Sequence, residues 1–295
     1  MQPRQLEYFV AVAEMGSFTA GARRVRTVQS AVSTAVRQLE HELGCRLFNR
    51  GRKISVTPEG AALLPRARDV LAAIEAATAA VAATRGQVTG TVNLGMMYRF
   101  GAFDMATRLA SFQHKYPSVV VRANTSTEGS RGHLDALRRG DLDLAIVATA
   151  TAMIPGMRMT YLDSEPLRFV CAVSHPLAEF ETVRLDQIAD ETFIDSPVGW
   201  GNRTLVDEAF ASAGLRRAVQ TETIDFALGQ ALAREGLGVT FVPESGVQTD
   251  QRLVALDVEP AIIWTAHLAC SANRRLSAAA AALASELELG ATSLK

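Results

Sequence analysis

The chain of 295 residues carries 30 Lys and Arg against 31 Asp and Glu, and 48% of its residues are hydrophobic. This composition excludes wholesale disorder, which needs low hydrophobicity and high net charge. The three cysteines are too few for a disulfide framework, and no apolar run approaches the roughly 20 residues of a membrane-spanning helix. Because the first residues include Glu7 and Glu14 and lack the pattern of a secretory signal, we expect a cytoplasmic protein with no membrane partner.

Charge is divided unevenly along the chain. Residues 1–89 hold 12 basic and 7 acidic side chains, whereas the remainder holds 18 basic and 24 acidic ones. A basic segment joined to an acidic one is typical of a nucleic-acid-binding module attached to another domain. The asymmetry alone does not establish such a module.

The first segment predicts three helices, over residues 4–15, about 18–25 and about 30–43. Gly16 suits a helix end and Ser17 suits the next N-cap. The third helix has apolar residues on one face, spaced +4, +3 and +4: Val32, Val36, Leu39 and Leu43.

The opposite face of the third helix carries short or donor-bearing side chains: Ser30, Ser33, Thr34 and Arg37. Two short helices joined by a tight break, the second with such a face, are typical of a helix-turn-helix, because only such side chains can approach base edges in the major groove. The alternative is the solvated face of an ordinary three-helix bundle.

Residues 47–57 predict a hairpin with its turn at Gly51. Arg50, Arg52 and Lys53 lie at its tip, where they favour a DNA-contacting wing that binds phosphate. A solvated turn remains the alternative.

Thr57-Pro58-Glu59 is typical of a helix start, and the predicted helix continues to about Arg85. Its heptad-like apolar positions are Leu64, Ala67, Leu71, Ile74, Thr78 and Val81. Pro65 is expected to kink or loosen its first turns. We interpret it as a dimerisation helix; a linker helix packed within its own chain is the alternative.

After Gly86–Gly90, short apolar runs alternate with helical stretches. Strands are predicted over 91–97, 118–124, 141–148, 167–173, 192–194, 239–242 and 262–269. This alternation indicates an α/β domain with mostly parallel sheets, and about 200 residues suffice for two lobes with a ligand-binding cleft.

Three stretches, 6–19, 29–50 and 55–67, resemble the winged helix-turn-helix of LysR-type transcriptional regulators. Residues 112–121, 137–147, 174–178 and 233–245 are similar, in order and spacing, to that family's effector domain. The resemblance implies an all-α winged helix-turn-helix over 1–58, a linker or dimerisation helix over 59–88, and an α/β effector domain over 89–295. That domain would have two periplasmic-binding-protein type II-like lobes, the first about 89–162 and 266–295, the second about 163–265.

The resemblance also implies a function. It implies a sequence-specific regulator that binds double-stranded DNA at an interrupted inverted repeat, as a homodimer or homotetramer, under the control of a small-molecule effector. RNA polymerase is a further candidate partner. The residues expected to contact DNA are Gln29, Ser30, Ser33, Thr34, Arg37, Arg50, Arg52 and Lys53.

Several residues depart from the family pattern. Gly21 stands where Ala is usual, at a cost of roughly 1 kcal/mol in helix propensity. Val25, Thr27 and Ser30 replace the usual Leu, Val and Pro. We expect the fold to be intact, and these departures leave the half-site sequence open.

The candidate effector-binding residues follow the predicted strands: Met97, Tyr98, Arg99, Phe100, Ser130, Arg131, Ser196, Pro197, Gly199, Trp200, Thr223 and Phe241. Arg99 takes the place of a ligand-contacting serine in relatives, and a guanidinium beside aromatic side chains suits an anionic, partly aromatic or apolar ligand. Alternatively, Arg99 pairs with Asp104 or Asp225 and bulky side chains fill the cleft.

Other functional classes find little support. The sequence has no HExxH, CxxC, P-loop or GxSxG motif, and its five histidines lack metal-ligand spacing. We therefore expect no enzyme, metal site or cofactor. A redox sensor is a further alternative, but Cys171 and Cys270 lie in or at the end of predicted strands and are expected to be structural. A binding protein without regulatory function would lack DNA affinity.

Overall fold

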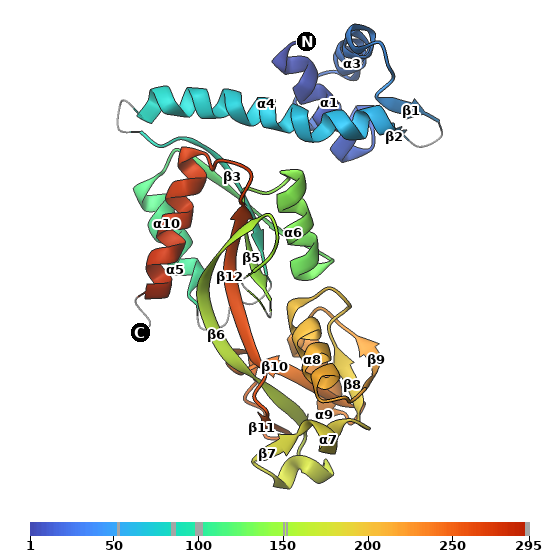
Figure 1. Cartoon of the computed structure of the whole chain (residues 1–295), viewed down its shortest axis with the longest axis vertical. Coiled ribbons are helices and arrows are strands. Elements are labelled where there is room, and N and C mark those ends of the chain that lie inside the picture. The colour runs from blue at the N-terminus through green and yellow to red at the C-terminus, as the bar shows by residue number, and fades with distance from the viewer. Residues whose placement is uncertain (52–53, 84–86, 98–102, 150, 152, 293–295) are drawn as a thin grey trace. The chain divides into compact units, whose positions relative to one another are not determined.

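The computed structural model describes residues 1–51, 54–83, 87–97, 103–149, 151 and 153–292 (Figure 1). Its contacts divide the chain into a first unit, Met1–Gly90, and a second unit, Thr91–Lys295. Each is described separately below. None of the described helices combines the length and apolar character needed to cross a membrane.

The first unit consists of helices and one small hairpin. Its elements are α1 (Pro3–Met15), α2 (Phe18–Arg24), α3 (Gln29–Leu43), β1 (Phe48–Arg50), β2 (Ile54–Val56) and α4 (Pro58–Ala83). Gly16 ends α1 in the left-handed conformation, and the Ser17 side chain accepts a hydrogen bond from Ala20 N at the start of α2. The helices and the hairpin predicted from residue spacing are therefore confirmed.

Aromatic and aliphatic side chains from all three short helices form the core of this unit. Phe9 of α1 and Phe48 of β1 are almost fully buried, and their ring centroids lie 5.4 Å apart. Val32, Val36 and Leu39 of α3 are fully buried. Three of the four residues of the predicted apolar face of α3 therefore face this core, whereas Leu43, at the last residue of the helix, is 42% exposed.

Gly21 lies where α2 crosses α1. A Cβ at this position would come within 3.0–3.1 Å of the backbone and side chain of Val12. The absence of a side chain therefore permits a close approach of the two helices, which offsets the helix propensity that glycine loses.

Helix α4 changes its surroundings along its length. Leu63, Leu64 and Leu71 pack against the core of the first unit, and Ala67 is buried there. Other large apolar side chains of the helix, from Val70 onward, are partly or largely exposed: Val70 (40%), Ile74 (42%) and Val81 (61%). The helix continues through Pro65.

The second unit is a mixed α/β structure. Its strands are β3 (Gly90–Met96), β4 (Val119–Thr125), β5 (Leu144–Ala148), β6 (Met157–Ala172), β7 (Thr182–Arg184), β8 (Thr192–Asp195), β9 (Ala218–Glu222), β10 (Val239–Pro243), β11 (Leu253–Glu259) and β12 (Ile263–Ser271). Its α-helices are α5 (Met105–Lys115), α6 (Gly129–Arg139), α7 (Leu185–Ile188), α8 (Gly201–Ser212), α9 (Phe226–Arg234) and α10 (Ala278–Thr292).

These ten described strands form one extended sheet with the order β4-β3-β5-β12-β6-β10-β8-β9, from which β11 and β7 branch at β6. Strands β3 and β5 are parallel, as are β8, β9 and β10. However, β12 is antiparallel to β5 and β6, and β6 is antiparallel to β10 and β11. The expectation of mostly parallel sheets was therefore wrong for the centre of the unit.

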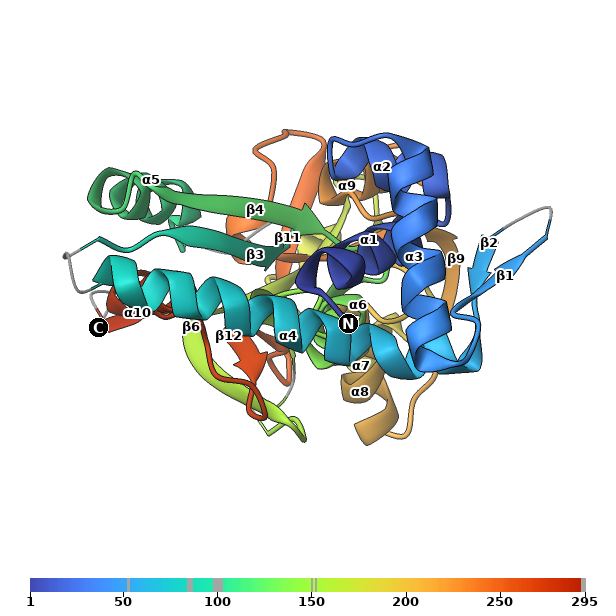
Figure 2. The ribbon, with the colours of Figure 1, turned by 90° about the horizontal axis from the view of Figure 1, so that it is seen from above.

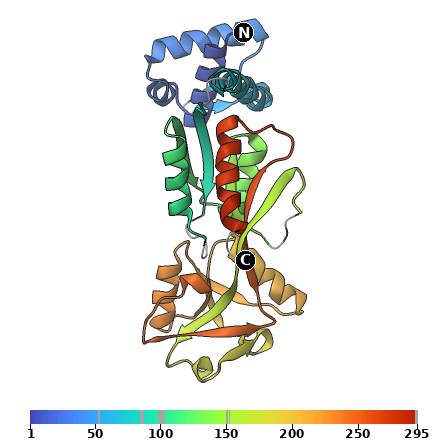
Figure 3. The ribbon, with the colours of Figure 1, turned by 90° about the vertical axis from the view of Figure 1, so that its left-hand side faces the viewer.

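Strands β6 and β12 connect two lobes (Figure 3). The first lobe contains β3, β4, β5, α5, α6 and α10, and the second contains the elements from β7 to β11. Strand β6 pairs with β12 from Met157 to Pro166, and then with β10 and β11 from Leu167 to Ala172. Residues at the ends of β3, β4 and β5, among them Met97, Ser126 and Ala148, thus line one cavity where the lobes join.

Candidate functional sites

The outer face of α3 is polar and accessible. Gln29, Ser30, Thr34 and Arg37 are exposed and Ser33 is half-buried. The Arg37 Nε donates a hydrogen bond to the Ser33 backbone oxygen at 3.3 Å, which holds the guanidinium along this face. The face therefore has hydroxyl, amide and guanidinium groups that can reach base edges.

The β1–β2 hairpin projects from the helices beside α3 (Figure 2). Arg52 and Lys53 lie outside the described residues, and the side chain of Arg50, at the end of β1, is not described either. Their predicted contacts with phosphate stay predictions.

A buried carboxylate fixes the start of the hairpin to α3. Glu40 is 9% exposed, and its Oε1 accepts hydrogen bonds from the backbone N–H groups of Leu47 (2.9 Å) and Phe48 (3.4 Å). Thr57 fixes the other end of the hairpin, because its hydroxyl donates to Arg46 O and accepts from Gly60 N. Helix α3 and the hairpin are thereby held in a fixed relation.

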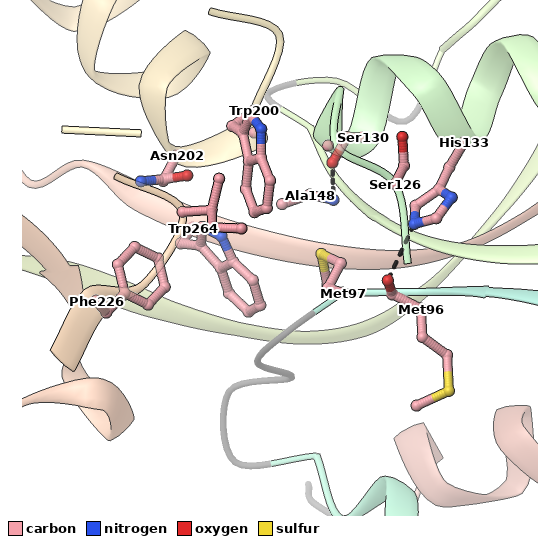
Figure 4. A pocket seen from close by; sticks show the side chains of 13 residues that line it. Met96, Met97, Ser126, Ser130, His133, Ala148, Trp200, Asn202, Phe226 and Trp264 are labelled. Carbon is pink, nitrogen blue, oxygen red and sulfur yellow. Dashed lines mark hydrogen bonds between the residues drawn. The ribbon is translucent and has the colours of Figure 1, made fainter. Parts of the chain in front are cut away.

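A cavity lies between the two lobes of the second unit (Figure 4). This first cavity encloses about 460 Å³, part of it open to solvent. Its apolar wall consists of Met96, Met97, Ala148, Trp200, Ile224, Phe226 and Trp264. Its polar groups come from Ser126, Ser130, His133 and Asn202. Both tryptophans of the chain line this cavity.

Two helices begin at the wall of the first cavity. Gly129 and Ser130 start α6, and Gly201 and Asn202 start α8. The N-terminal turn of a helix carries a partial positive charge, although in α6 the N–H groups of Gly129, Arg131 and Gly132 already have backbone acceptors. The cavity thus combines an apolar wall with an electrostatic preference for anionic groups.

The two lobes also touch beside the first cavity. The Trp200 indole N–H donates to Thr127 O at 3.2 Å, and Arg131 N donates to Gly199 O at 3.3 Å. Gly129 has φ +58°, and a Cβ there would lie 2.8 Å from the Trp200 ring. Glycine at this position therefore allows the two turns to meet.

His133 is a buried histidine in the wall of the first cavity. The residue is 3% exposed, and its Nε2 lies 3.0 Å from Met96 O, so we assign the proton to Nε2. Burial lowers the pKa of His133 from its ordinary value of 6.5, and the bond to Met96 opposes this only in part. The neutral ring is thus the form that the folded state favours.

Acidification is therefore expected to destabilise the second unit. Because the folded-state pKa of His133 is depressed, its contribution to stability is present above pH 6.5 and is lost as the pH falls through the folded-state pKa. Denaturant unfolding, followed by tryptophan fluorescence at pH 7.5 and 5.5, measures the effect. A His133→Gln variant keeps a donor for Met96 O and should show a smaller difference between the two pH values; an equal difference would contradict the assignment.

The predicted effector residues divide into four sets. Met97, Ser130 and Trp200 line the first cavity. Ser196, Thr223 and Phe241 line a smaller, second cavity in the second lobe. Arg131, Pro197 and Gly199 are in neither lining, although Arg131 and Gly199 join the lobes. Tyr98, Arg99 and Phe100 lie outside the described residues, so the predicted role of Arg99 stays a prediction.

Sequence reasoning missed several lining residues of the first cavity: Ser126, His133, Asn202, Ile224, Phe226 and Trp264. Ser126 directly follows β4 and Ile224 lies two residues after β9, a position that could have marked them. Trp264 gave no such signal, because it lies inside β12 and has the spacing of a core residue.

The cysteines differ in accessibility. Cys171 is buried inside β6, and burial raises its pKa to about 11. Such a thiol is a poor nucleophile at neutral pH. Cys45 and Cys270 are half-buried, and Cys45 lies in the first unit.

Comparisons with known proteins cover both units. A family model described as LysR substrate binding domain matches residues 85–290, and one described as bacterial regulatory helix-turn-helix protein, lysR family, matches residues 3–61. The transcriptional dual regulator GltC of Bacillus subtilis is 30% identical over 285 residues, covering 95% of this chain and 94% of the relative. The HTH-type transcriptional regulator YybE of the same organism is 31% identical over 245 residues, covering 83% of each chain.

Among solved structures, a full-length OxyR variant from Pseudomonas aeruginosa aligns with a TM-score of 0.76 at 22% identity, covering 98% of this chain and 95% of that one. At this level of identity the similarity shows a shared fold.

Proposed function

Because the chain belongs to the LysR family of bacterial transcriptional regulators, we propose that α3 and the β1–β2 hairpin bind a specific operator and that a small anionic effector occupies the first cavity. The protein is a DNA-binding transcriptional regulator with an effector-binding domain. We propose in addition which residues contact the DNA and which class of small molecule binds as the effector.

The observation that carries the DNA contact is the two-sided character of α3. Its apolar face is buried in the core, whereas Gln29, Thr34 and Arg37 are exposed together. Glutamine can pair bidentately with adenine and arginine with guanine. The hairpin beside α3 carries three basic residues at its tip, which suits contact with phosphate.

The effector class follows from the first cavity. Aromatic and sulfur-containing side chains favour a ligand with an apolar or aromatic body. The starts of α6 and α8, with the hydroxyl of Ser130 and the amide of Asn202, favour an acidic group at the same end. Arg99, from its place in the sequence, would supply a further fork-shaped donor.

The exposed apolar residues of α4 support association of two copies. Val70, Ile74 and Val81 remain uncovered in the single chain, and burial against the same helix of a second copy would remove them from water. A homodimer so formed would present two α3 helices to an interrupted inverted repeat, and two dimers would form a tetramer.

The remaining partners follow from this role. A regulator bound near a promoter can contact RNA polymerase, which we therefore retain as a further partner. Its operator is chromosomal DNA, and we accordingly place the protein in the bacterial cytoplasm.

Fluorescence anisotropy on the DNA upstream of the protein's own gene tests the proposal. Tight binding that resists competitor DNA at two salt concentrations supports a specific operator. Binding that disappears with competitor at both salt concentrations would contradict specific recognition of this DNA.

Substitutions at two arginines should separate base from phosphate contacts. Arg37→Ala is expected to weaken binding to the operator by about 1–3 kcal/mol while leaving binding to random DNA nearly unchanged. Arg52→Ala is expected to weaken binding to all sequences alike and to reduce the salt slope by about one. Arg66→Ala, an 81% exposed arginine on α4, is the matched control. A uniform loss from Arg37→Ala, or an operator-specific loss from Arg52→Ala, would reverse the assignment.

A further inference from the structure

The second cavity adjoins the first one and has a different chemistry. It is a small hollow in the second lobe, about 180 Å³ including space open to solvent, and it shares Asn202 and Phe226 with the first cavity. Its other walls include Ser196, Thr223 and Thr240. Whereas the first cavity is mainly apolar, the second is lined by three hydroxyl groups.

The hydroxyl of Thr240 differs from the other two in its hydrogen bonding. Thr240 lies on β10 and is only 4% exposed, yet within the described part of the chain its Oγ1 takes part in no hydrogen bond. The Oγ1 atom is not fully enclosed, because it faces the second cavity, where water can reach it. A ligand group in the cavity would replace this water as its hydrogen-bond partner.

The neighbouring groups mostly have acceptor capacity to spare. Asp225 caps α9, and its Oδ1 accepts from Ala227 N at 2.8 Å, which leaves the second carboxylate oxygen for another donor. Thr223 Oγ1 accepts from Asp225 N, and Ser196 Oγ accepts from Asn202 Nδ2. A carboxylate at this wall disfavours an anionic group and favours a donor.

Gly229 keeps the space open. It lies inside α9, where alanine would favour the helix, and a Cβ would meet Thr223, Thr240 and Ile194 at ordinary contact distances of 3.6–3.8 Å. A methyl group here would thus occupy part of the second cavity without displacing its neighbours.

From these contacts we propose that the second cavity is a specificity subsite that accepts a hydroxyl or ammonium group of the effector, bound by Thr240 and Asp225. The proposal rests on the proposed effector site, since the acidic group and apolar body of the same molecule occupy the first cavity. The effector is then an apolar-bodied acid that carries a hydrogen-bond donor at its far end.

The test uses 3-phenylpropanoate and its 4-methyl, 4-hydroxy and 4-aminomethyl derivatives as probes for the full-length protein. Because both tryptophans line the first cavity, quenching of intrinsic fluorescence reports binding. The 4-hydroxy and 4-aminomethyl compounds are expected to bind at least about fivefold more tightly than the 4-methyl compound.

Two variants locate this preference. Thr240→Val preserves shape and removes the hydroxyl, so the advantage of the 4-hydroxy compound over the 4-methyl compound should fall. Gly229→Ala should weaken all three substituted compounds about tenfold and leave 3-phenylpropanoate unchanged, with an unfolding midpoint no lower than that of the unmodified protein. Thr221→Val, on β9 outside both cavities, is the matched control.

Equal affinity for the methyl and hydroxy compounds would overturn the proposal, as would a preference that both variants retain. Failure of all four probes to bind would also overturn it. The DNA-binding function is judged separately, by anisotropy on the operator in the absence of any probe, so the two failures are distinguishable.

Discussion

Replacement of Arg217 by methionine is expected to lower the free energy of unfolding of the second unit by about 3–5 kcal/mol. The Arg217 side chain is 3% exposed and that of Asp195 is 1% exposed, and their charged atoms lie 2.5 Å apart. The guanidinium also lies over the Phe193 ring, 5.0 Å from its centroid. Without it, a buried carboxylate would lose its counter-ion.

Asp195 is a carboxylate in a location that disfavours its charged form. Burial raises its pKa, even though Arg217 and the Ser196 N–H lower it. Denaturant unfolding at pH 7.5, followed by tryptophan fluorescence, measures the loss in Arg217→Met. The double variant Asp195→Asn with Arg217→Met should recover much of the stability, because it leaves no unpaired charge. A loss below about 1 kcal/mol in the single variant would place this pair with weak surface ion pairs.

The second large effect is expected from Glu40→Ala in the first unit. Two N–H groups at the start of the hairpin would lose a charged acceptor, at a cost of about 2–3 kcal/mol. Because Glu40 also fixes the hairpin to α3, operator affinity should fall together with stability. Thermal unfolding followed by circular dichroism, with anisotropy on the operator, measures both.

Two variants control this prediction. Glu40→Gln keeps an acceptor oxygen and should lose less stability than the alanine variant. Glu42→Ala removes a carboxylate from the same helix that is 41% exposed on its side chain, and its effect should be much smaller. Equal midpoints and equal operator affinity for Glu40→Ala and Glu42→Ala would show that the hairpin does not depend on this carboxylate.

The fold was predictable wherever one face of an element is buried. The helical period of α3 could be read from Val32, Val36 and Leu39, because only one side of that helix packs against the core. Strand β6 was different: its prediction began at residue 167, whereas the strand begins at Met157. Its first ten residues include Asp163, Glu165 and Pro166, and lie where the strand passes between lobes, so burial does not impose an alternating pattern on them.

The candidate site was predictable to the extent that strand ends mark it. Met97, Ser130 and Trp200 follow strands, and the structure brings all three to one cavity. Trp264 reaches the same cavity from the middle of β12, and its sequence neighbours make it indistinguishable from a core residue. Periodicity shows that a side chain is buried but not which distant segment it faces, because that depends on strand order.

The continuous β6–β12 pairing connects the lobes by strands whose twist can change. The two strands pair from Met157 to Pro166 without a loop, and their only change of register is a bulge between Ala266 and His267. Strand β12 also pairs with β5 from Ala266 to Ala269, so a two-stranded ribbon exists only where Ile263–Thr265 pairs with Ser164–Pro166. A change of twist in this ribbon, next to the bulge, would let the lobes move relative to each other. Substitutions along this ribbon can then alter the stiffness against which an effector works, without touching either cavity.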